Sequence, residues 1–184
     1  KFFYDEYRMN QTVAVYPDDY VALLDGVTMG GGVGLSIHGR YRVATERTLF
    51  AMPETGIGLI PDVGGTHALA RLPGFIGTWL ALTGARIKAA DCVYAGIATH
   101  YIPSDRLPLL RELLAKGEEP VDQILATLDA PAGETTLEAL RDAVFAWLAL
   151  RPLAPLEQEV LLVQSNGAAE WLKMAQASST GICA

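Results

Sequence analysis

Short apolar segments separated by glycine dominate the first half of the chain. Tyr20–Asp25 is apolar and is followed by turn-forming residues, which predicts a buried strand. Tyr41–Ala44 and Thr48–Ala51 predict two more short strands joined by a turn. Between the first two strands, Gly30–Gly34 predicts a loop that leads into a short helix over Leu35–His38.

Beyond Gly65 the spacing of apolar residues becomes three and four, which is typical of helices. Segments with this spacing cover residues 66–72, 75–82 and 89–94, with glycines at the expected helix ends. Ala98–Ile102 predicts another strand, and Ser104 with Asp105 predicts the start of a helix that ends near Lys116. This order of strands followed by helices predicts a mixed α/β class.

The ends of the chain have their own patterns. Phe2–Met9 alternates apolar and charged residues in the manner of an amphipathic helix. Residues 118–136 are richer in Pro and Glu and predict a linker between helices. Leu137–Met174 is helix-prone apart from two prolines.

Composition excludes several classes of protein. The 184 residues are 51% hydrophobic and 19% charged, which is typical of a folded domain with a sizeable core. A net charge of −7 argues against a general nucleic-acid binder, because backbone phosphates demand a basic surface. It leaves open a local site for an anionic small molecule. The longest apolar run, Ala143–Leu150, is far too short to span a bilayer.

The cysteines and histidines give no sign of a metal site. Cys92 and Cys183 are far apart and lack metal-type spacing, which predicts a reducing compartment. His38, His67 and His100 share no ligand spacing either.

The glycine-rich segment has to be weighed against several chemistries. It contains no G-x-G-x-x-G, and no lysine occurs between Lys1 and Lys88, so neither nucleotide-binding motif is present. The hydrolase motif G-x-S-x-G also fails, because the stretch around Ser36 is one residue too long. Two interpretations remain open. Either backbone N–H groups around Gly31 form an oxyanion hole, or the glycines allow close packing of helix on strand.

Two carboxylates follow the predicted strands. Glu54 and Asp62 lie among apolar residues in a loop rich in Gly and Pro, and burial raises the pKa of a carboxyl group toward neutrality. Both are therefore candidates for a general acid or base. The structural alternatives are that Glu54 binds backbone N–H groups of its loop and that Asp62 caps the helix beginning near Gly64.

Other charged residues have stronger structural alternatives. Glu6 lies on the predicted amphipathic helix, where a charge usually belongs to a solvated face. Arg40, Arg42 and Arg47 cluster near the second strand and fit either surface charge or a site for an anionic ligand.

Taken together, three segments resemble the crotonase (enoyl-CoA hydratase/isomerase) superfamily. They are Met29–Ser36, Phe50–Leu59 and Pro61–Gly65, and the similarity is strongest to the branch of 3-hydroxyisobutyryl-CoA hydrolases. The similarity is dense from Phe2 to about Ile102 and thin after about Gly133. It implies an α/β fold with a crotonase-like spiral core of ββα units. We expect this core over residues 1–117 and a helical C-terminal region over 118–184.

The resemblance also implies roles for individual residues. Gly31 matches the glycine whose N–H forms half of the oxyanion hole, and Glu54 and Asp62 match acidic residues beside the thioester carbonyl. Glu6 matches an additional substrate-binding carboxylate. Hydratases of the superfamily carry a further glutamate at the position of Gly34, so the glycine there favours hydrolysis over hydration. Asp62 points the same way, because a glycine is usual at that position in hydratases.

The implied activity is hydrolysis of a CoA thioester, namely 3-hydroxyisobutyryl-CoA to 3-hydroxyisobutyrate and CoA in valine catabolism. Two alternatives stay open: an enoyl-CoA hydratase or isomerase of the same fold, and a non-catalytic fragment that needs a partner. No cofactor is expected, since coenzyme A is part of the substrate. The expected partner is a small-molecule acyl-CoA, with no nucleic acid and no membrane. The oligomeric state is open, with a homo-oligomer among the alternatives. We expect a cytoplasmic location if the protein is bacterial and the mitochondrial matrix if it is eukaryotic.

The chain also has the features of an interior fragment. It begins at Lys1 without Met, and the superfamily's segment with the adenine-binding loop and the second oxyanion N–H would lie upstream. We therefore expect residues 1–184 alone to show negligible turnover of acyl-CoA and weak CoA binding. Release of free thiol from an acyl-CoA substrate measures this, and robust activity of the 184-residue chain would contradict it.

Overall fold

The computed structural model describes residues 1–149, in which the strands form two three-stranded sheets. In the first sheet, β3 (Tyr41–Ala44) lies between β1 (Val21–Leu24) and β6 (His100–Tyr101), and both pairs are parallel. Parallel neighbours require long crossover connections, and helices supply them here. The predicted α/β class is therefore confirmed.

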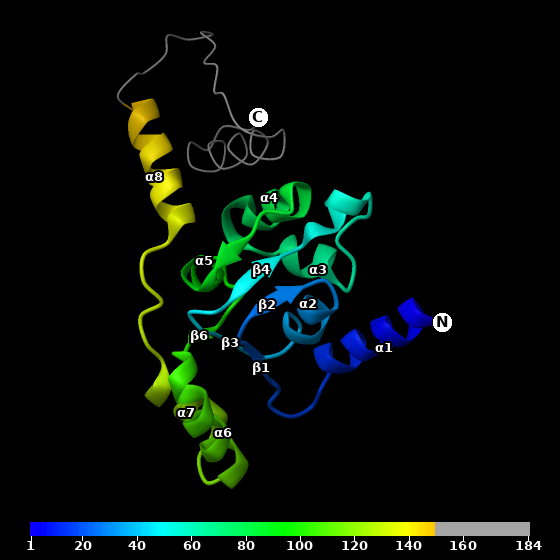
Figure 1. Cartoon of the computed structure of the whole chain (residues 1–184), viewed down its shortest axis with the longest axis vertical. Helices are drawn as coiled ribbons and strands as arrows, with labels where there is room; N and C mark the ends of the chain where they lie inside the picture. Colours follow the sequence, from blue (N-terminus) through cyan, green and yellow to red (C-terminus); the bar gives the residue numbers. More distant parts are fainter. Residues whose placement is uncertain (150–184) are drawn as a thin grey trace.

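The second sheet lies between the first sheet and the helices α3 to α5 (Figure 1). Its central strand is β4 (Leu49–Ala51), which runs parallel to β2 (Val27–Met29) and antiparallel to β5 (Ile87–Lys88). Phe50 on β4 is fully buried, so this sheet contributes directly to the main core.

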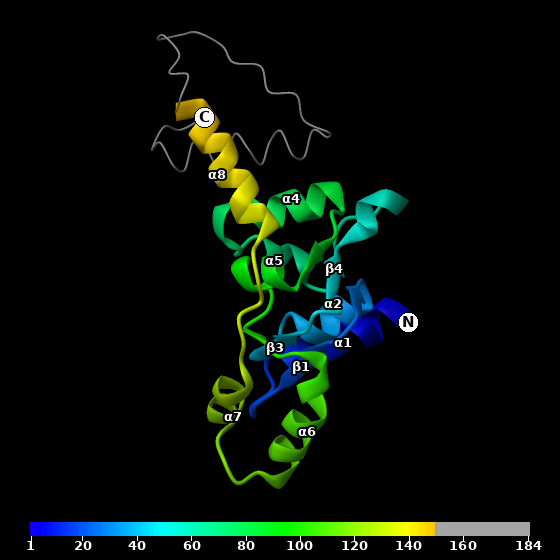
Figure 2. The same cartoon turned by 60° about the vertical axis from the view of Figure 1, so that its left-hand side comes forward.

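Helices surround the two sheets, and several short 3₁₀ turns (η) connect them. In chain order the helical elements are α1 (Phe2–Ala14), α2 (Gly31–Ser36), η1 (Pro53–Ile57), α3 (Gly65–Leu69), η2 (Pro73–Phe75), α4 (Ile76–Thr83), α5 (Ala89–Tyr94), η3 (Ser104–Arg106), α6 (Leu107–Lys116), α7 (Val121–Leu128) and α8 (Thr136–Ala149). Figures 1 and 2 show α1 beside α2 at one edge of the molecule, with α6 and α7 together at one end and α8 at the other.

Period-two alternation along β3 divides the apolar side chains between two cores. Tyr41 and Val43 pack with residues of α6 and α7, whereas Ala44 belongs to the larger core around α2, α4 and α5. The smaller core also includes Ile102, which follows β6. The sheet of β1, β3 and β6 is thus covered on both faces, as parallel sheets usually are.

Most of the predicted elements are confirmed. The three strands expected in the first half are β1, β3 and β4, and the amphipathic segment at the start forms α1. The helices expected over 75–82 and 89–94 are α4 and α5. Residues 150–184, including Cys183 and the rest of the helix-prone segment to Met174, lie outside the described residues.

The prediction that Gly30–Gly34 forms a loop was wrong. Only Gly30 makes a turn, with φ of 51° that favours glycine, and α2 begins at Gly31 directly after the unpredicted strand β2. The carbonyl of Gly30 accepts hydrogen bonds from the N–H groups of Val33 and Gly34. Burial of Val33 in the core stabilises this first turn in spite of the low helix propensity of glycine.

Residues 118–136 were wrongly predicted as a linker, because they contain α7. Pro120 precedes the helix as its N-cap, where the missing N–H costs nothing. The buried residues Ile124, Leu125 and Leu128 have the spacing of one helical face, and they pack in the smaller core with α6. α7 thus packs against the same core as α6.

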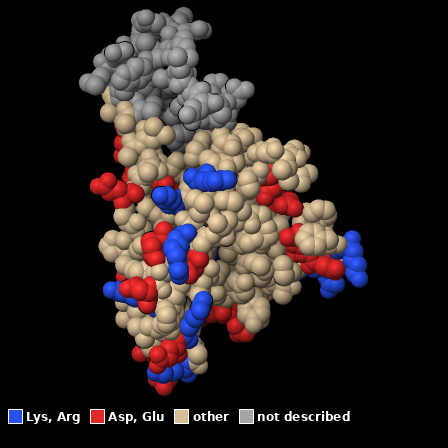
Figure 3. All heavy atoms as spheres, viewed as in Figure 1, with Lys and Arg blue, Asp and Glu red and all other residues tan. Residues whose placement is uncertain are grey.

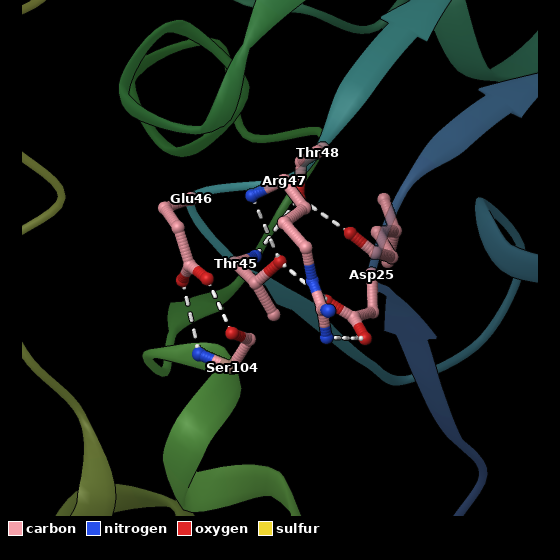
Figure 4. A network of polar contacts seen from close by, with 7 residues as sticks. Asp25, Thr45, Glu46, Arg47, Thr48 and Ser104 are labelled. Atoms are coloured by element: carbon pink, nitrogen blue, oxygen red, sulfur yellow. Dashed lines mark hydrogen bonds and ion pairs between the residues drawn. The ribbon is translucent and has the colours of Figure 1, made fainter.

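A polar network ties the end of β1 to the turn after β3 (Figure 4). The Asp25 carboxylate accepts hydrogen bonds from Thr45 Oγ1 and Arg47 Nε, both at 2.8 Å. In the same turn, Glu46 accepts from the backbone N–H and the hydroxyl of Ser104 in η3. These contacts fix the relative position of β1, β3 and η3.

Two glycine-to-alanine variants test the packing of α2. A Cβ on residue 34 would lie 2.8 Å from the Cβ of Val63 and 2.7 Å from Asn10 Oδ1, whereas a Cβ on residue 32 would have nothing within 4 Å. We expect Gly34→Ala to lower the free energy of unfolding by about 1–3 kcal/mol through overpacking. The control Gly32→Ala should raise it by about 0.4–1 kcal/mol through reduced freedom of the unfolded chain. Urea denaturation measures both, and equal stability of the two variants would contradict the close contact.

Candidate active site

Two of the predicted site carboxylates lie beside the entrance to α2. Gly31 is the first residue of this helix, so its N–H has no carbonyl one turn earlier in the helix to bind. A Cβ built on Gly31 would lie 3.0 Å from Glu6 Oε1, which places that carboxylate of α1 directly beside the helix entrance. A Cβ built on Gly30 would lie 3.9 Å from Glu54 Oε1. Two carboxylates therefore face the first turn of α2 from different elements.

Glu54 is buried although its side chain carries a charge. It stands in η1 immediately after β4, where Pro53 starts the turn, and only 7% of the residue is exposed. Its Oε2 has no hydrogen-bond partner among the described residues. Burial raises the pKa of the Glu54 carboxyl above its ordinary value, the contact with its own backbone N–H opposes this, and the negative charge of Asp62 raises the pKa further. The structural alternative was that Glu54 binds backbone N–H groups of its loop. The carboxylate contacts the N–H of its own residue, but this contact does not account for the unpartnered Oε2.

Asp62 does not cap the following helix. The N-cap of α3 is Gly64, and no side chain forms a cap hydrogen bond there. The Asp62 carboxylate instead accepts a hydrogen bond of 3.1 Å from the hydroxyl of Tyr7 on α1. The structural alternative for Asp62 was therefore wrong, and the side chain is linked to the same helix that carries Glu6.

The site is thus assembled from three segments that are far apart in the sequence. α1 contributes Glu6, α2 contributes the N–H of Gly31, and the stretch from η1 to α3 contributes Glu54 and Asp62. Glu6 and Glu54 lie beside the first turn of α2, and Asp62 is linked to them through its hydrogen bond with Tyr7 and through the effect of its charge on Glu54. A backbone donor next to a buried carboxylate of raised pKa can stabilise an oxyanion and accept a proton from water.

Gly34 leaves no room for a further side chain at this site. The Cβ of Val63 and the amide of Asn10 occupy the space beside its Cα, and Asn10 is itself 5% exposed. The amide oxygen and nitrogen of Asn10 have no hydrogen-bond partner among the described residues. A glutamate at position 34 would collide with both neighbours, so a second glutamate for hydration cannot stand here.

Two other nucleophiles are engaged or inactive. The Ser36 hydroxyl donates to the carbonyl of Gly32 at 2.8 Å inside α2. Burial, with the Asp91 carboxylate beside it, raises the pKa of the Cys92 thiol to about 12, so the thiol stays protonated at neutral pH. Neither group is available for attack on a substrate.

The clustered arginines have structural partners. Arg40 forms an ion pair of 3.0 Å with Asp19, and Arg47 binds Asp25. Arg42 donates to three backbone carbonyls, those of Gly39, Gly96 and Ile97. Basic and acidic side chains are also interspersed on the face shown in Figure 3. Arg42 therefore belongs to the framework of the fold, whereas Arg40 and Arg47 form exposed ion pairs.

Within residues 1–149, no group of three or more His, Cys, Asp or Glu side chains could hold a metal ion. His38 makes a contact of 2.8 Å from Nε2 to the carbonyl of Val63, and so supports the turn that carries Asp62. None of the helices in this part of the chain has the length and apolar character needed to cross a bilayer.

Sequence reasoning missed Tyr7 and Asn10. Both lie on the same helix as Glu6, at spacings of one and four residues. A helix places residues i and i+4 on one face. Once the face with Glu6 is known to pack against α2, Asn10 is therefore expected to pack there too. The helical pattern alone gave no sign of which face that is, because Phe2, Phe3 and Tyr4 are exposed although they are apolar.

Comparison with known proteins agrees with this geometry. A family model described as enoyl-CoA hydratase/isomerase matches residues 1–180. The chain belongs to the enoyl-CoA hydratase/isomerase family. The match extends well beyond Gly133, where the resemblance was expected to become thin. The crotonase fold predicted from the motifs is confirmed.

The chain matches only part of the length of each curated relative. The chain is 44% identical over 181 residues to a mitochondrial 3-hydroxyisobutyryl-CoA hydrolase of Danio rerio. The aligned region covers 95% of this chain and 47% of that protein. With the Homo sapiens protein of the same name, identity is 54% over 127 residues, or 69% of this chain and 33% of that one. The chain therefore spans at most about half the length of these curated relatives.

Solved structures show the same partial coverage. A crystal structure of an enoyl-CoA hydratase from Rhodobacter sphaeroides is similar with a TM-score of 0.71 and 42% identity, over 94% of this chain and 49% of that one. A carnitinyl-CoA dehydratase from Mycobacterium thermoresistibile matches with a TM-score of 0.71 and 37% identity, over 95% and 51% respectively. The names of these relatives cover different reactions on CoA esters, so the residues of the site must decide among them.

The burial of Glu54 predicts a pH-dependent effect on stability. Between the ordinary pKa and the raised pKa, the folded protein holds a proton that the unfolded chain has lost, so stability falls as pH rises through this window. Glu54→Gln has no proton to lose. We expect the variant to be more stable than wild type above this window and the difference to shrink below the ordinary glutamate pKa of about 4.3.

Urea denaturation at a series of pH values measures this difference. The exposed Glu119 provides a matched control, because Glu119→Gln removes a surface carboxylate. A Glu54→Gln variant that is less stable than wild type at neutral pH would show that the carboxylate is paired in the folded protein.

Proposed function

We propose that the protein is an acyl-CoA thioester hydrolase that converts 3-hydroxyisobutyryl-CoA to 3-hydroxyisobutyrate and CoA. The observation that supports the proposal is the buried Glu54 carboxylate beside the first turn of α2, where Gly31 begins the helix and the charge of Asp62 acts on Glu54. The curated relatives named as hydrolases of this substrate support it, at 44% identity for the protein from Danio rerio.

In the proposed reaction, the thioester carbonyl oxygen accepts a hydrogen bond from the Gly31 N–H. Attack on the carbonyl carbon moves negative charge onto this oxygen, and the donor stabilises the tetrahedral intermediate. Loss of one such donor typically costs about 10²–10³ in kcat. Collapse of the intermediate breaks the carbon–sulfur bond and releases CoA as the thiolate, which takes up a proton.

Glu54 supplies the base or the nucleophile. Its raised pKa suits a base that accepts a proton from water near neutral pH. In the other route, its carboxylate attacks the carbonyl and forms an anhydride, which water then hydrolyses. Asp62 orients the substrate hydroxyl or assists proton transfer, and Glu6 contributes a substrate-binding carboxylate next to Gly31.

Hydration of an enoyl-CoA is the second candidate, since the Rhodobacter sphaeroides relative is named an enoyl-CoA hydratase. Hydration across a C=C bond uses two carboxylates to orient and deprotonate one water. The closed space at Gly34 and the presence of Asp62 at the site favour hydrolysis. A non-catalytic role in complex with a partner is the third candidate.

The test uses the protein expressed at its natural full length, with 3-hydroxyisobutyryl-CoA and crotonyl-CoA as substrates. We expect release of free CoA from the first, followed with a thiol reagent, and little hydration of the second. Glu54→Gln should lower kcat by about 10²-fold or more through loss of the base or nucleophile. The exposed variant Glu119→Gln should leave turnover unchanged.

The outcomes separate the three candidates. Efficient hydration of crotonyl-CoA without thiol release would show that the protein is a hydratase. Absence of both reactions at full length would favour a non-catalytic role. If the Glu54→Gln variant still releases thiol at the wild-type rate, Glu54 is neither the base nor the nucleophile.

A further inference from the structure

We propose that Tyr7 is a positioning residue, which holds the Asp62 carboxylate toward the reacting atoms and links α1 to the turn before α3. The inference rests on the proposed hydrolase function and extends it to a residue outside the predicted site. Its basis is the hydrogen bond of 3.1 Å from the Tyr7 hydroxyl to Asp62 Oδ2.

Tyr7 stands between two carboxylates of the site. It follows Glu6 directly on α1, and its hydroxyl reaches Asp62 across the gap between α1 and the turn. Desolvation raises the pKa of the Tyr7 phenol, and the hydrogen bond and the charges of Asp62 and Glu6 raise it further. The phenol therefore stays protonated and can donate throughout the physiological range of pH.

The backbone that carries Asp62 is held by other contacts. Its carbonyl accepts from the N–H of Gly65 at 2.6 Å, and the next carbonyl, of Val63, contacts His38 Nε2 at 2.8 Å. Val63 has φ of 46°, a conformation that a β-branched residue adopts only where surrounding contacts enforce it. These contacts fix the turn but leave the carboxylate of Asp62 to its own side-chain rotation.

Tyr7 supplies the side-chain hydrogen bond that limits this rotation. Among the described residues, it is the Tyr7 hydroxyl that donates a side-chain hydrogen bond to the Asp62 carboxylate. Because α1 also places Glu6 beside Gly31, the same helix sets the positions of two carboxylates relative to the oxyanion donor. Loss of the Tyr7 hydroxyl would leave the fold of α1 intact and free the Asp62 carboxylate to rotate.

The variant Tyr7→Phe tests the proposal in the full-length protein. Tyr7 is 45% exposed, so water can partly replace its hydrogen bond, and we expect kcat for thiol release to fall by about 3- to 10-fold with little change in KM. Tyr4→Phe is the matched control, because Tyr4 lies one turn earlier on α1 and is 65% exposed. It should keep wild-type kinetics.

A double-mutant cycle separates positioning from a general structural effect. If Tyr7 acts through Asp62, then Tyr7→Phe should have no further effect on kcat in the Asp62→Ala background. Wild-type kcat in Tyr7→Phe, or the same fold-loss in both backgrounds, would overturn the proposal. Absence of thiol release by the wild-type protein would instead overturn the proposed function.

The contact itself can be measured without turnover. Titration of Tyr7 by NMR of ¹³C-labelled tyrosine, assigned with Tyr7→Phe, should show a pKa that falls toward 10.0 in Asp62→Asn, because the charge of Asp62 raises it in the wild type. An unchanged Tyr7 pKa in that variant would show that the hydrogen bond does not form, and would overturn the proposal whatever the activity.

Discussion

The close contact between α1 and α2 is the feature on which the rest of the candidate site depends. Gly31 and Gly34 lie on one edge of α2, and Glu6 and Asn10, one turn apart on α1, pack against that edge. The contact is close because these two positions have no side chain. Larger residues there would push α1 outward, and so would move Glu6 away from the helix entrance and Tyr7 away from Asp62.

The electrostatics of the site follow from this assembly. Glu6 and Glu54 lie beside one helix entrance, and Asp62 is linked to them through Tyr7 and through its charge. Glu54 is buried whereas Glu6 and Asp62 are partly exposed, so water screens Glu54 least. Asp62 has a phenol as donor, whereas Oε2 of Glu54 has none among the described residues. Two acidic groups in one site are thereby placed in different environments, which is how a protein assigns them different roles.

The framework of the fold was largely predictable from the sequence, because each strand and helix carries its own periodicity. The errors fall where local propensity and tertiary packing disagree. Gly31–Gly34 has poor helix propensity, yet it forms α2 because Val33 is buried in the core. Residues 121–128 have the apolar spacing of a helix, but the neighbouring Pro and Glu residues obscured it until the packing against α6 was known.

The sequence by itself determined the family and predicted the four candidate residues Glu6, Gly31, Glu54 and Asp62, since their motifs are local and specific. Only the tertiary structure decided the surroundings of each group. Whether Asp62 caps a helix or binds Tyr7 depends on a residue 55 positions away, and the burial of Glu54 depends on packing that brings the turn at Gly30 next to it. A pKa or a hydrogen-bond partner is set by neighbours in space, and local sequence does not contain those neighbours.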